Sequence, residues 1–147
     1  MTRRAVLDSN VIVSGLGWSG APARIVEAVL AGELVLVTSA PLLAELRRVL
    51  AYPKLAKAIP DGSRLADLVE MSSVVVEPLS VFAVAEDESD NRVLEAAVAA
   101  GVDCMVSGDE HLLTLGMFQG IPILSQPSSS GRCCPRNCGI VVLCGWF

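Results

Sequence analysis

Five short apolar runs lie along residues 1–125, and helix-like segments separate them. The runs are AVLDSN (5–10), LVLVTS (34–39), SSVVVEPL (72–79), DCMVSG (103–108) and IPILS (121–125). Each is too apolar to keep one face in water, which is typical of strands in a parallel sheet covered on both faces. Strands that alternate with helices define the α/β class. We therefore expect an open, doubly wound sheet of about five parallel strands with helices on both faces.

The segments between the runs have apolar residues at helical spacing and end in turn residues. The helix-like segments are APARIVEAVLA, SAPLLAELRRVLAYP, DGSRLADLVEM, NRVLEAAVAAG and DEHLLTLG. In the second of these, Ser39 is the expected N-cap, Pro41 falls in the first turn and Pro53 lies beyond the end. These features predict a helix directly after the second strand.

The composition suits one domain with a large core. The chain has 147 residues, 52% of them hydrophobic, which suffices for one ordinary domain but not for two. No apolar run approaches the roughly 20 residues that a membrane helix needs. An aspartate also interrupts the first apolar stretch, where a signal peptide would have its core. We therefore expect a cytoplasmic protein that does not contact the membrane.

Residues 126–147 differ from the rest of the chain. They begin with a Pro/Ser/Gly-rich stretch, contain four of the five cysteines and show no helical period. Cys133, Cys134 and Cys138 lack the paired C-x-x-C spacing of a zinc site, so we expect no metal there. We divide the chain into a domain of residues 1–125 and an atypical cysteine-containing tail of residues 126–147.

The net charge restricts how this protein could act on nucleic acid. Eleven Lys and Arg residues against sixteen Asp and Glu residues give a formal charge of −5. This balance argues against a protein that coats nucleic acid through bulk positive charge. It does not exclude a nuclease, because acids gathered around a metal ion make the formal count negative while the ion supplies local positive charge.

Three aspartates stand next to the strands of the predicted sheet. Asp8 closes the first strand, Asp109 follows CMVSG, and Asp90 precedes the helix that feeds that strand. Because ligands of such sheets gather at the carboxyl ends of the strands, these aspartates are candidates for one metal site of oxygen ligands. Each, taken alone, also suits the N-cap of a helix, and the two interpretations stay open at this point.

Glu45 is a fourth candidate, on the helix after the second strand. At about 100° per residue it lies at the margin of the apolar stripe, whereas Arg48 points away from it. The stripe consists of Leu42, Leu43, Leu46, Val49 and Leu50. A carboxylate in this position either faces a cleft or is solvated, and periodicity does not choose between the two.

Four segments together resemble the PIN domain family, and most closely its VapC-like toxins from bacterial toxin–antitoxin pairs. The segments are VLDSNVIVSGL, SAPLLAELRRVL, DNRVLEAAVAAGVDCMVSGDEHLLTLG and GIPILS. The resemblance covers the chain from about Arg4 to Ser125. It rests on four acids that occur in the family's order and spacing.

The resemblance implies specific roles for individual residues. The family's four acids fall on Asp8, Glu45, Asp90 and Asp109, which are expected to hold the metal and act in catalysis. Within the acidic cluster, Asp90 is the first choice and Asp87 the second, with Asp87 contributing through water. Ser9, Asn10 and Ser107 match supporting positions. Arg24, Arg47 and Arg48 are candidates for phosphate contact, although exposed arginines are more often simply solvated.

The implied activity is a Mg²⁺- or Mn²⁺-dependent endoribonuclease. Divalent ions held by carboxylates make water nucleophilic and stabilise the charge that develops at phosphorus. The expected partners are an RNA substrate, a cognate antitoxin protein and a second copy of the chain in a homodimer. All of these expectations follow from the resemblance.

Two other classes of protein are considered. A non-catalytic PIN-like module that binds RNA or protein is the main alternative, and the presence of all four acids argues against it. A receiver or phosphotransfer domain would have a different aspartate motif or a late lysine, and no lysine follows Lys57. The chain also lacks the P-loop and Rossmann glycine patterns, which disfavours a nucleotide cofactor.

Overall fold

The computed structural model describes residues 3–17, 21–78 and 88–125, with the backbone alone described at 17, 21–24 and 88–90. The strands in these ranges are β1 (Arg3–Leu7), β2 (Leu34–Ser39), β3 (Ser73–Val76), β4 (Cys104–Ser107), β5 (Met117–Phe118) and β6 (Ile121–Ser125). The helices are α1 (Ser9–Gly17), α2 (Ala21–Leu30), α3 (Ala40–Leu50), α4 (Pro53–Ala58), α5 (Gly62–Met71), α6 (Glu88–Ala100) and α7 (Glu110–Leu115).

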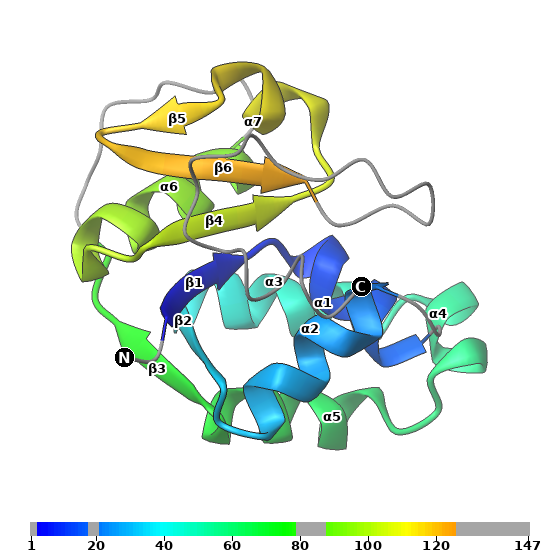
Figure 1. Ribbon diagram of the computed structural model, residues 1–147. Coiled ribbons are helices and arrows are strands. Elements are labelled where there is room, and N and C mark those ends of the chain that lie inside the picture. The colour runs from blue at the N-terminus through cyan, green and yellow to red at the C-terminus, as the bar shows by residue number, and fades with distance from the viewer. Residues whose placement is uncertain (1–2, 18–20, 79–87, 126–147) are drawn as a thin grey trace.

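The strands form one sheet in the order β3-β2-β1-β4-β6-β5 (Figure 1). β1 pairs in parallel with both β2 and β4, and β3 and β6 extend the parallel sheet on either side. Each of the five parallel strands overlaps one of the five apolar runs of the sequence, so the predicted α/β class is confirmed. The two-residue β5 adds an antiparallel edge to β6 and makes the sheet mixed.

A tight turn between β5 and β6 explains the antiparallel edge. Its two residues, Gln119 and Gly120, both have positive φ, at 49° and 79°. Two central residues with positive φ characterise the hairpin turn whose twist matches that of the flanking strands. Glycine supplies this conformation without steric cost at the second position.

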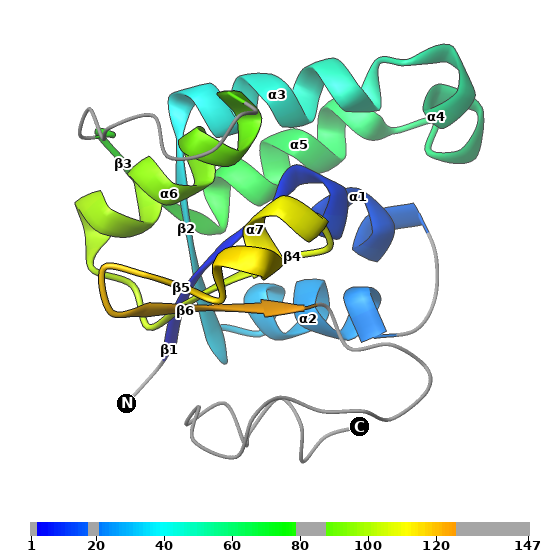
Figure 2. The same cartoon turned by 90° about the horizontal axis from the view of Figure 1, so that it is seen from above.

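Helices cover both faces of the sheet, as the apolar character of the strands requires. Ala5 and Leu7 of β1 belong to an apolar cluster with residues of α1, α2, α3 and α5. Val6, between them, belongs to a second cluster, which contains residues of α6 and α7. In Figure 2, β1 and β2 run between α6 on one side and α1 and α2 on the other.

The helix after the second strand begins as the sequence predicts. The side chain of Ser39 accepts a hydrogen bond from the Leu42 amide at 3.5 Å, and a proline lies in the first turn of α3. Leu42, Leu43, Leu46 and Leu50 are buried. Pro53 lies beyond the end of α3, as expected, and also begins the short helix α4, which the sequence pattern did not predict.

One expectation along the chain is wrong, and another is not tested. α6 begins at Glu88, so Asp90 lies in the first turn of this helix and not before it. The tail of residues 126–147 lies outside the described residues. Within the described ranges, no helix combines the length and the apolar character needed to cross a membrane.

Shortening Leu46 tests how α3 is held on the sheet. This side chain is 1% exposed, so Leu46→Ala removes buried methyl groups and leaves a cavity. We expect the free energy of unfolding to fall by about 2–5 kcal/mol in urea titrations. Leu68→Ala is the matched control, because Leu68 is 41% exposed; a change within about 0.5 kcal/mol is expected there. Equal losses in the two variants would contradict the packing described here.

Candidate functional site

Asp8 lies directly after β1, in the middle of the sheet, where α1 begins. Its amide donates to the carbonyl of Val106 on β4 at 3.0 Å, so the β1–β4 ladder continues up to this residue. The amides of Val11 and Ile12 in turn donate to its carbonyl. The residue is 7% exposed, and its carboxylate accepts a hydrogen bond from the Asn10 amide. The strand, its neighbour and the following helix together hold this aspartate in place.

Ser107, the last residue of β4, connects two of the predicted acids. It is completely buried, and its hydroxyl donates to Asp8 Oδ2 at 2.9 Å. The Ser107 hydroxyl oxygen in turn accepts a hydrogen bond from the Asp109 amide at 3.0 Å. Parallel pairing of Leu7 with Val106 brings the two strand ends to the same edge of the sheet. Ser107 therefore fixes the Asp8 carboxylate relative to the backbone at Asp109.

Asp109 caps α7, the helix that follows β4. Its Oδ1 accepts a hydrogen bond from the His111 amide at 2.8 Å. The residue is partly buried, and it is close enough to Asp8 for the two carboxylates to repel one another. The capping role that the sequence left open for Asp109 therefore holds, and it coexists with a place beside Asp8.

Glu45 approaches the same edge from α3. Its side chain is only 10% exposed, and Ser9 Oγ donates to Glu45 Oε2 at 3.4 Å. Ser9 follows Asp8 and is itself 3% exposed. The position at the margin of the buried stripe thus turns this carboxylate toward the start of α1. Asp8, Ser9, Glu45, Ser107 and Asp109 are the predicted residues that the structure brings together.

Electrostatics at Asp8 reflect burial and neighbouring charge. Burial raises the pKa of Asp8 above its ordinary value of 3.8, because a charged carboxylate loses solvation. Repulsion from the carboxylates of Glu45 and Asp109 raises the pKa further. Hydrogen bonds from Ser107 and Asn10 act in the opposite direction without cancelling the effect. Burial and repulsion therefore disfavour the charged form of Asp8, and a bound cation would offset this cost.

The donors at this edge fit a hard divalent cation in their chemistry. Carboxylate and hydroxyl oxygens are the ligands that Mg²⁺ and Mn²⁺ prefer. Among the residues whose side chains are described, no group of three or more His, Cys, Asp or Glu side chains is arranged to hold a metal ion. A complete ligand set at this edge therefore needs a further residue or a closer approach of the acids.

The remaining predicted residues are placed less fully. Asp87 lies outside the described residues, and for Asp90 only the backbone, in the first turn of α6, is described. Asn10 is exposed, and its backbone amide donates a hydrogen bond to Asp8.

Of the arginines predicted to contact phosphate, Arg24 is described by its backbone alone. Arg47 contacts Asp67 and Glu70 of α5 at 2.7 Å each.

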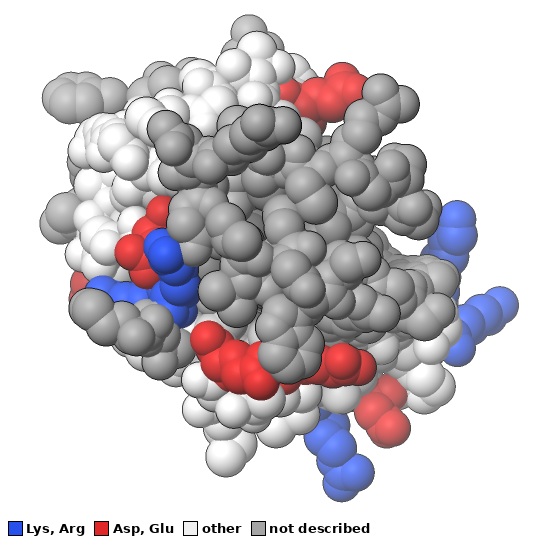
Figure 3. Space-filling view, in the orientation of Figure 1, with Lys and Arg blue, Asp and Glu red and all other residues white. Residues whose placement is uncertain are grey.

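Positive charge lies on one side of the site. Arg48 Nη2 is 4.0 Å from Glu45 Oε1, and 61% of the Arg48 side chain is exposed. Lys54 and Lys57 are exposed on α4, the next helix along the chain. Figure 3 shows basic side chains standing out on the right of the molecule, where Figure 1 places α4. Cations therefore extend from the edge of the acidic site toward α4.

The fold and the site define an α/β domain with buried acid at the carboxyl edge of its central strands, where ligands of such sheets bind. The sequence profile described as PIN domain matches residues 4–111. The chain therefore belongs to the PIN domain family, whose members are in general nucleases.

Two similar proteins are consistent with this family. The uncharacterized protein MJ1680 of Methanocaldococcus jannaschii is 28% identical over 116 residues, which cover 76% of this chain and 74% of that protein. A chain in the structure of VapBC2 from Rickettsia felis, bound to a DNA fragment from its promoter, superposes with a TM-score of 0.59. That match covers 84% of this chain and 99% of the other at 12% identity, so it shows a shared fold.

Removing the Ser107 hydroxyl tests the connection between the two strand ends. Ser107→Ala leaves a buried Asp8 oxygen without its donor and the Asp109 amide without its acceptor. We expect the free energy of unfolding to fall by about 1–3 kcal/mol. Ser125→Ala is the matched control, because Ser125 pairs with Ser107 in register but is exposed. Urea titrations of both variants measure the difference, and equal stabilities would contradict the bridging role.

Replacing Asp8 with asparagine tests whether the pKa of Asp8 is raised in the native state. Because the pKa of Asp8 is raised, the native state binds this proton more tightly than the unfolded state does. The stability that Asp8 contributes therefore falls as pH rises from 3.8 through the raised pKa. We expect the unfolding free energy of the wild type, minus that of Asp8→Asn, to decrease over this window and then level off. Urea titrations in chelating buffer measure it, and a difference that grows with pH would refute the interpretation.

Proposed function

We propose that this PIN domain is a Mg²⁺- or Mn²⁺-dependent endoribonuclease and the toxin of a toxin–antitoxin pair. The observation that carries the proposal is Asp8, a buried carboxylate held by Ser107 and Asn10 beside two further acids. A buried carboxylate among like charges is costly unless a cation or proton compensates it. In a family whose members are in general nucleases, a catalytic divalent cation would supply this compensation.

In this proposal each residue has a distinct task. Asp8, Glu45 and Asp109, together with Asp90, would hold the metal, and Asp87 would contribute through water. Ser107 orients the Asp8 carboxylate, Ser9 orients Glu45, and the Asn10 amide stabilises the charged form of Asp8. When bound, the metal supplies a nucleophilic water near neutral pH and stabilises negative charge at the phosphate. One of the carboxylates accepts the proton of the attacking water.

The proposed partners follow from the family and from the solved neighbour. The structure of VapBC2 bound to a DNA fragment from its promoter contains a chain with the fold of this protein. By analogy, a small antitoxin would cover the acidic edge, and the toxin would form a homodimer. RNA would be the substrate, and both proteins would act in the cytoplasm.

A cleavage assay tests the proposed activity. Structured RNAs are incubated with the protein in Mg²⁺ or Mn²⁺, and the wild type is compared with Asp8→Asn and Asp90→Asn. Loss of a residue that only supports a metal ligand costs up to about 100-fold in activity. Because Asp8 and Asp90 are proposed as ligands themselves, we expect each variant to cleave at least about 100-fold more slowly. Isothermal titration calorimetry should show that Mn²⁺ binds to the wild type and binds more weakly to both variants.

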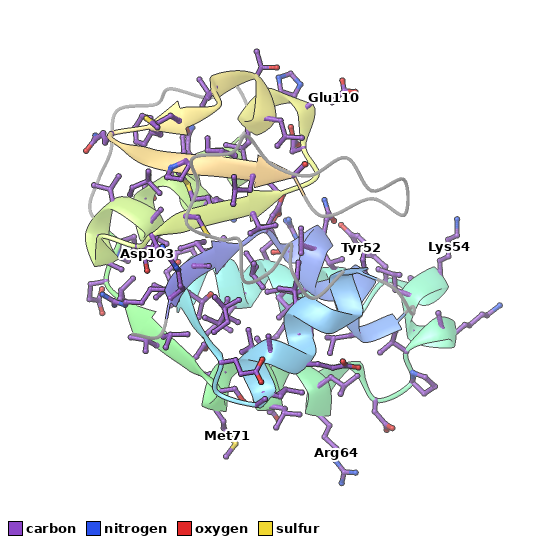
Figure 4. All side chains as sticks on the ribbon, viewed as in Figure 1. Tyr52, Lys54, Arg64, Met71, Asp103 and Glu110 are labelled. Carbon is purple, nitrogen blue, oxygen red and sulfur yellow. The ribbon has the colours of Figure 1, made fainter. Side chains whose placement is uncertain are left out.

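A matched control separates the site from general acidity. Glu110 is exposed next to Asp109, and Figure 4 shows its side chain pointing out from α7. Glu110→Gln removes the same charge and should leave cleavage unchanged. Equal cleavage by the wild type, Asp8→Asn and Asp90→Asn would overturn the proposal. Unchanged RNA binding by all variants without any cleavage would instead favour a non-catalytic RNA-binding module.

A further inference from the structure

A row of three side chains leads outward from the acidic site along α3. Glu45, Arg48 and Tyr52 are separated by three and then four residues, and seven residues complete nearly two helical turns. α3 ends at Leu50, but Ala51 keeps helical dihedral angles and the Tyr52 amide donates to the Val49 carbonyl at 3.1 Å. The three residues therefore start from the same side of one helical path. Tyr52 begins about 10 Å beyond Glu45 along the axis.

Arg48, the second member of the row, is available to a ligand. Its guanidinium is 4.0 Å from Glu45, and most of the side chain is exposed. An exposed ion pair at this spacing contributes little to stability, so a stabilising role does not account for an arginine at this position. Arg47, its neighbour, is engaged by two acids of α5 and faces another way. A guanidinium at the rim of a metal site is suited to contact a phosphate beside the one being cleaved.

Tyr52, the third member, exposes half of its surface. The residue is 51% exposed although its ring is a large apolar group. It occupies the N-cap position of α4, yet its side chain makes no capping hydrogen bond. Figure 4 shows Tyr52 at the corner between α3 and α4, on the side of the molecule from which Lys54 extends. An exposed aromatic ring flanked by cations is the arrangement on which unpaired bases stack.

The cations of α4 continue the row. Lys54 and Lys57 are exposed and follow Tyr52 directly along the chain. A chain with a formal charge of −5 repels a polyanion on average. An RNA strand therefore needs a local cationic path to reach an acidic site. Arg48, Lys54 and Lys57 provide such a path, with one aromatic ring among them.

We propose that single-stranded RNA reaches the acidic site along the α3–α4 corner, with a base stacked on Tyr52 and phosphates contacting Arg48, Lys54 and Lys57. A single strand is favoured over a duplex, because bases must be unpaired to stack on a side chain. This proposal rests on the proposed ribonuclease function and adds a binding surface to it. Tyr52 acts as a positioning residue and does not touch the reacting phosphate.

Fluorine NMR tests stacking without cleavage. Tyr52 is the single tyrosine of the chain, so protein labelled with 3-fluorotyrosine gives one ¹⁹F resonance. The labelled protein is titrated in chelating buffer with oligoadenylate, with oligouridylate and with the duplex that the two form. We expect the resonance to shift with each single strand and much less with the duplex. Because phosphate contacts depend on salt, the shift should decrease as salt is raised.

Variants then assign the contributions to binding and cleavage. Tyr52→Ala should weaken single-strand binding about tenfold and raise KM without lowering kcat, and Tyr52→Phe should restore both. Lys54→Ala and Lys57→Ala should each weaken binding and reduce the salt dependence by about one unit of slope. Arg64→Ala is the matched control, because Arg64 is exposed on α5 and points away from Tyr52 in Figure 4.

The outcomes separate this proposal from the ribonuclease function. One outcome would overturn the path and leave the nuclease function intact. In it, RNA is bound and cleaved without shifting the ¹⁹F resonance of Tyr52, and the variants at residue 52 bind and cleave RNA as the wild type does. Equal losses in Arg64→Ala and Lys54→Ala would also overturn the path, because the cations would then act only through net charge. A protein that neither binds nor cleaves RNA would overturn the ribonuclease function, and the path with it.

Discussion

The hydrogen bond from Ser107 to Asp8 is the interaction on which the site depends. The two residues are 99 positions apart in the chain and become neighbours only because β1 and β4 pair in parallel. The hydroxyl accepts the Asp109 amide while it donates to Asp8, so one buried atom sets the geometry at both strand ends. A polar atom can occupy this position in the core because both of its hydrogen-bonding functions are satisfied.

The same arrangement places like charges side by side at this edge. The sheet is stabilised by apolar residues on both faces, and this burial offsets the cost of enclosing Asp8 beside Glu45 and Asp109. Helix starts at Ser9 and Glu110 add backbone amides that favour negative charge. The Asp8 carboxylate is thus buried beside two further acids, an arrangement that a small divalent cation would stabilise.

The sequence predicts the parts of this structure that depend on local pattern. The apolar runs identified the five parallel strands, Ser39 identified the start of α3, and the stripe on α3 located Glu45 at its margin. Local pattern could not reveal the two-residue strand β5, because its pairing depends on a turn with positive φ at a glutamine. Nor could it show that Arg47 is engaged by α5, because that contact joins residues distant in sequence. For Asp109 the two sequence interpretations proved compatible, since one carboxylate oxygen caps α7.

The helix α3 also explains how an acidic protein could handle a polyanion. Its inner face buries leucines, its margin presents Glu45 to the site, and the same helical side continues outward to Arg48 and Tyr52. Tyr52 carries no motif, so the only signal for it in the sequence is its spacing of two turns from Glu45. Tyr52 follows α3 by two residues, after Ala51 at the C-cap, so the end of this helix sets where the Tyr52 backbone begins relative to Glu45. Net charge therefore says little about substrate, since opposite charges lie on consecutive turns of the same helix.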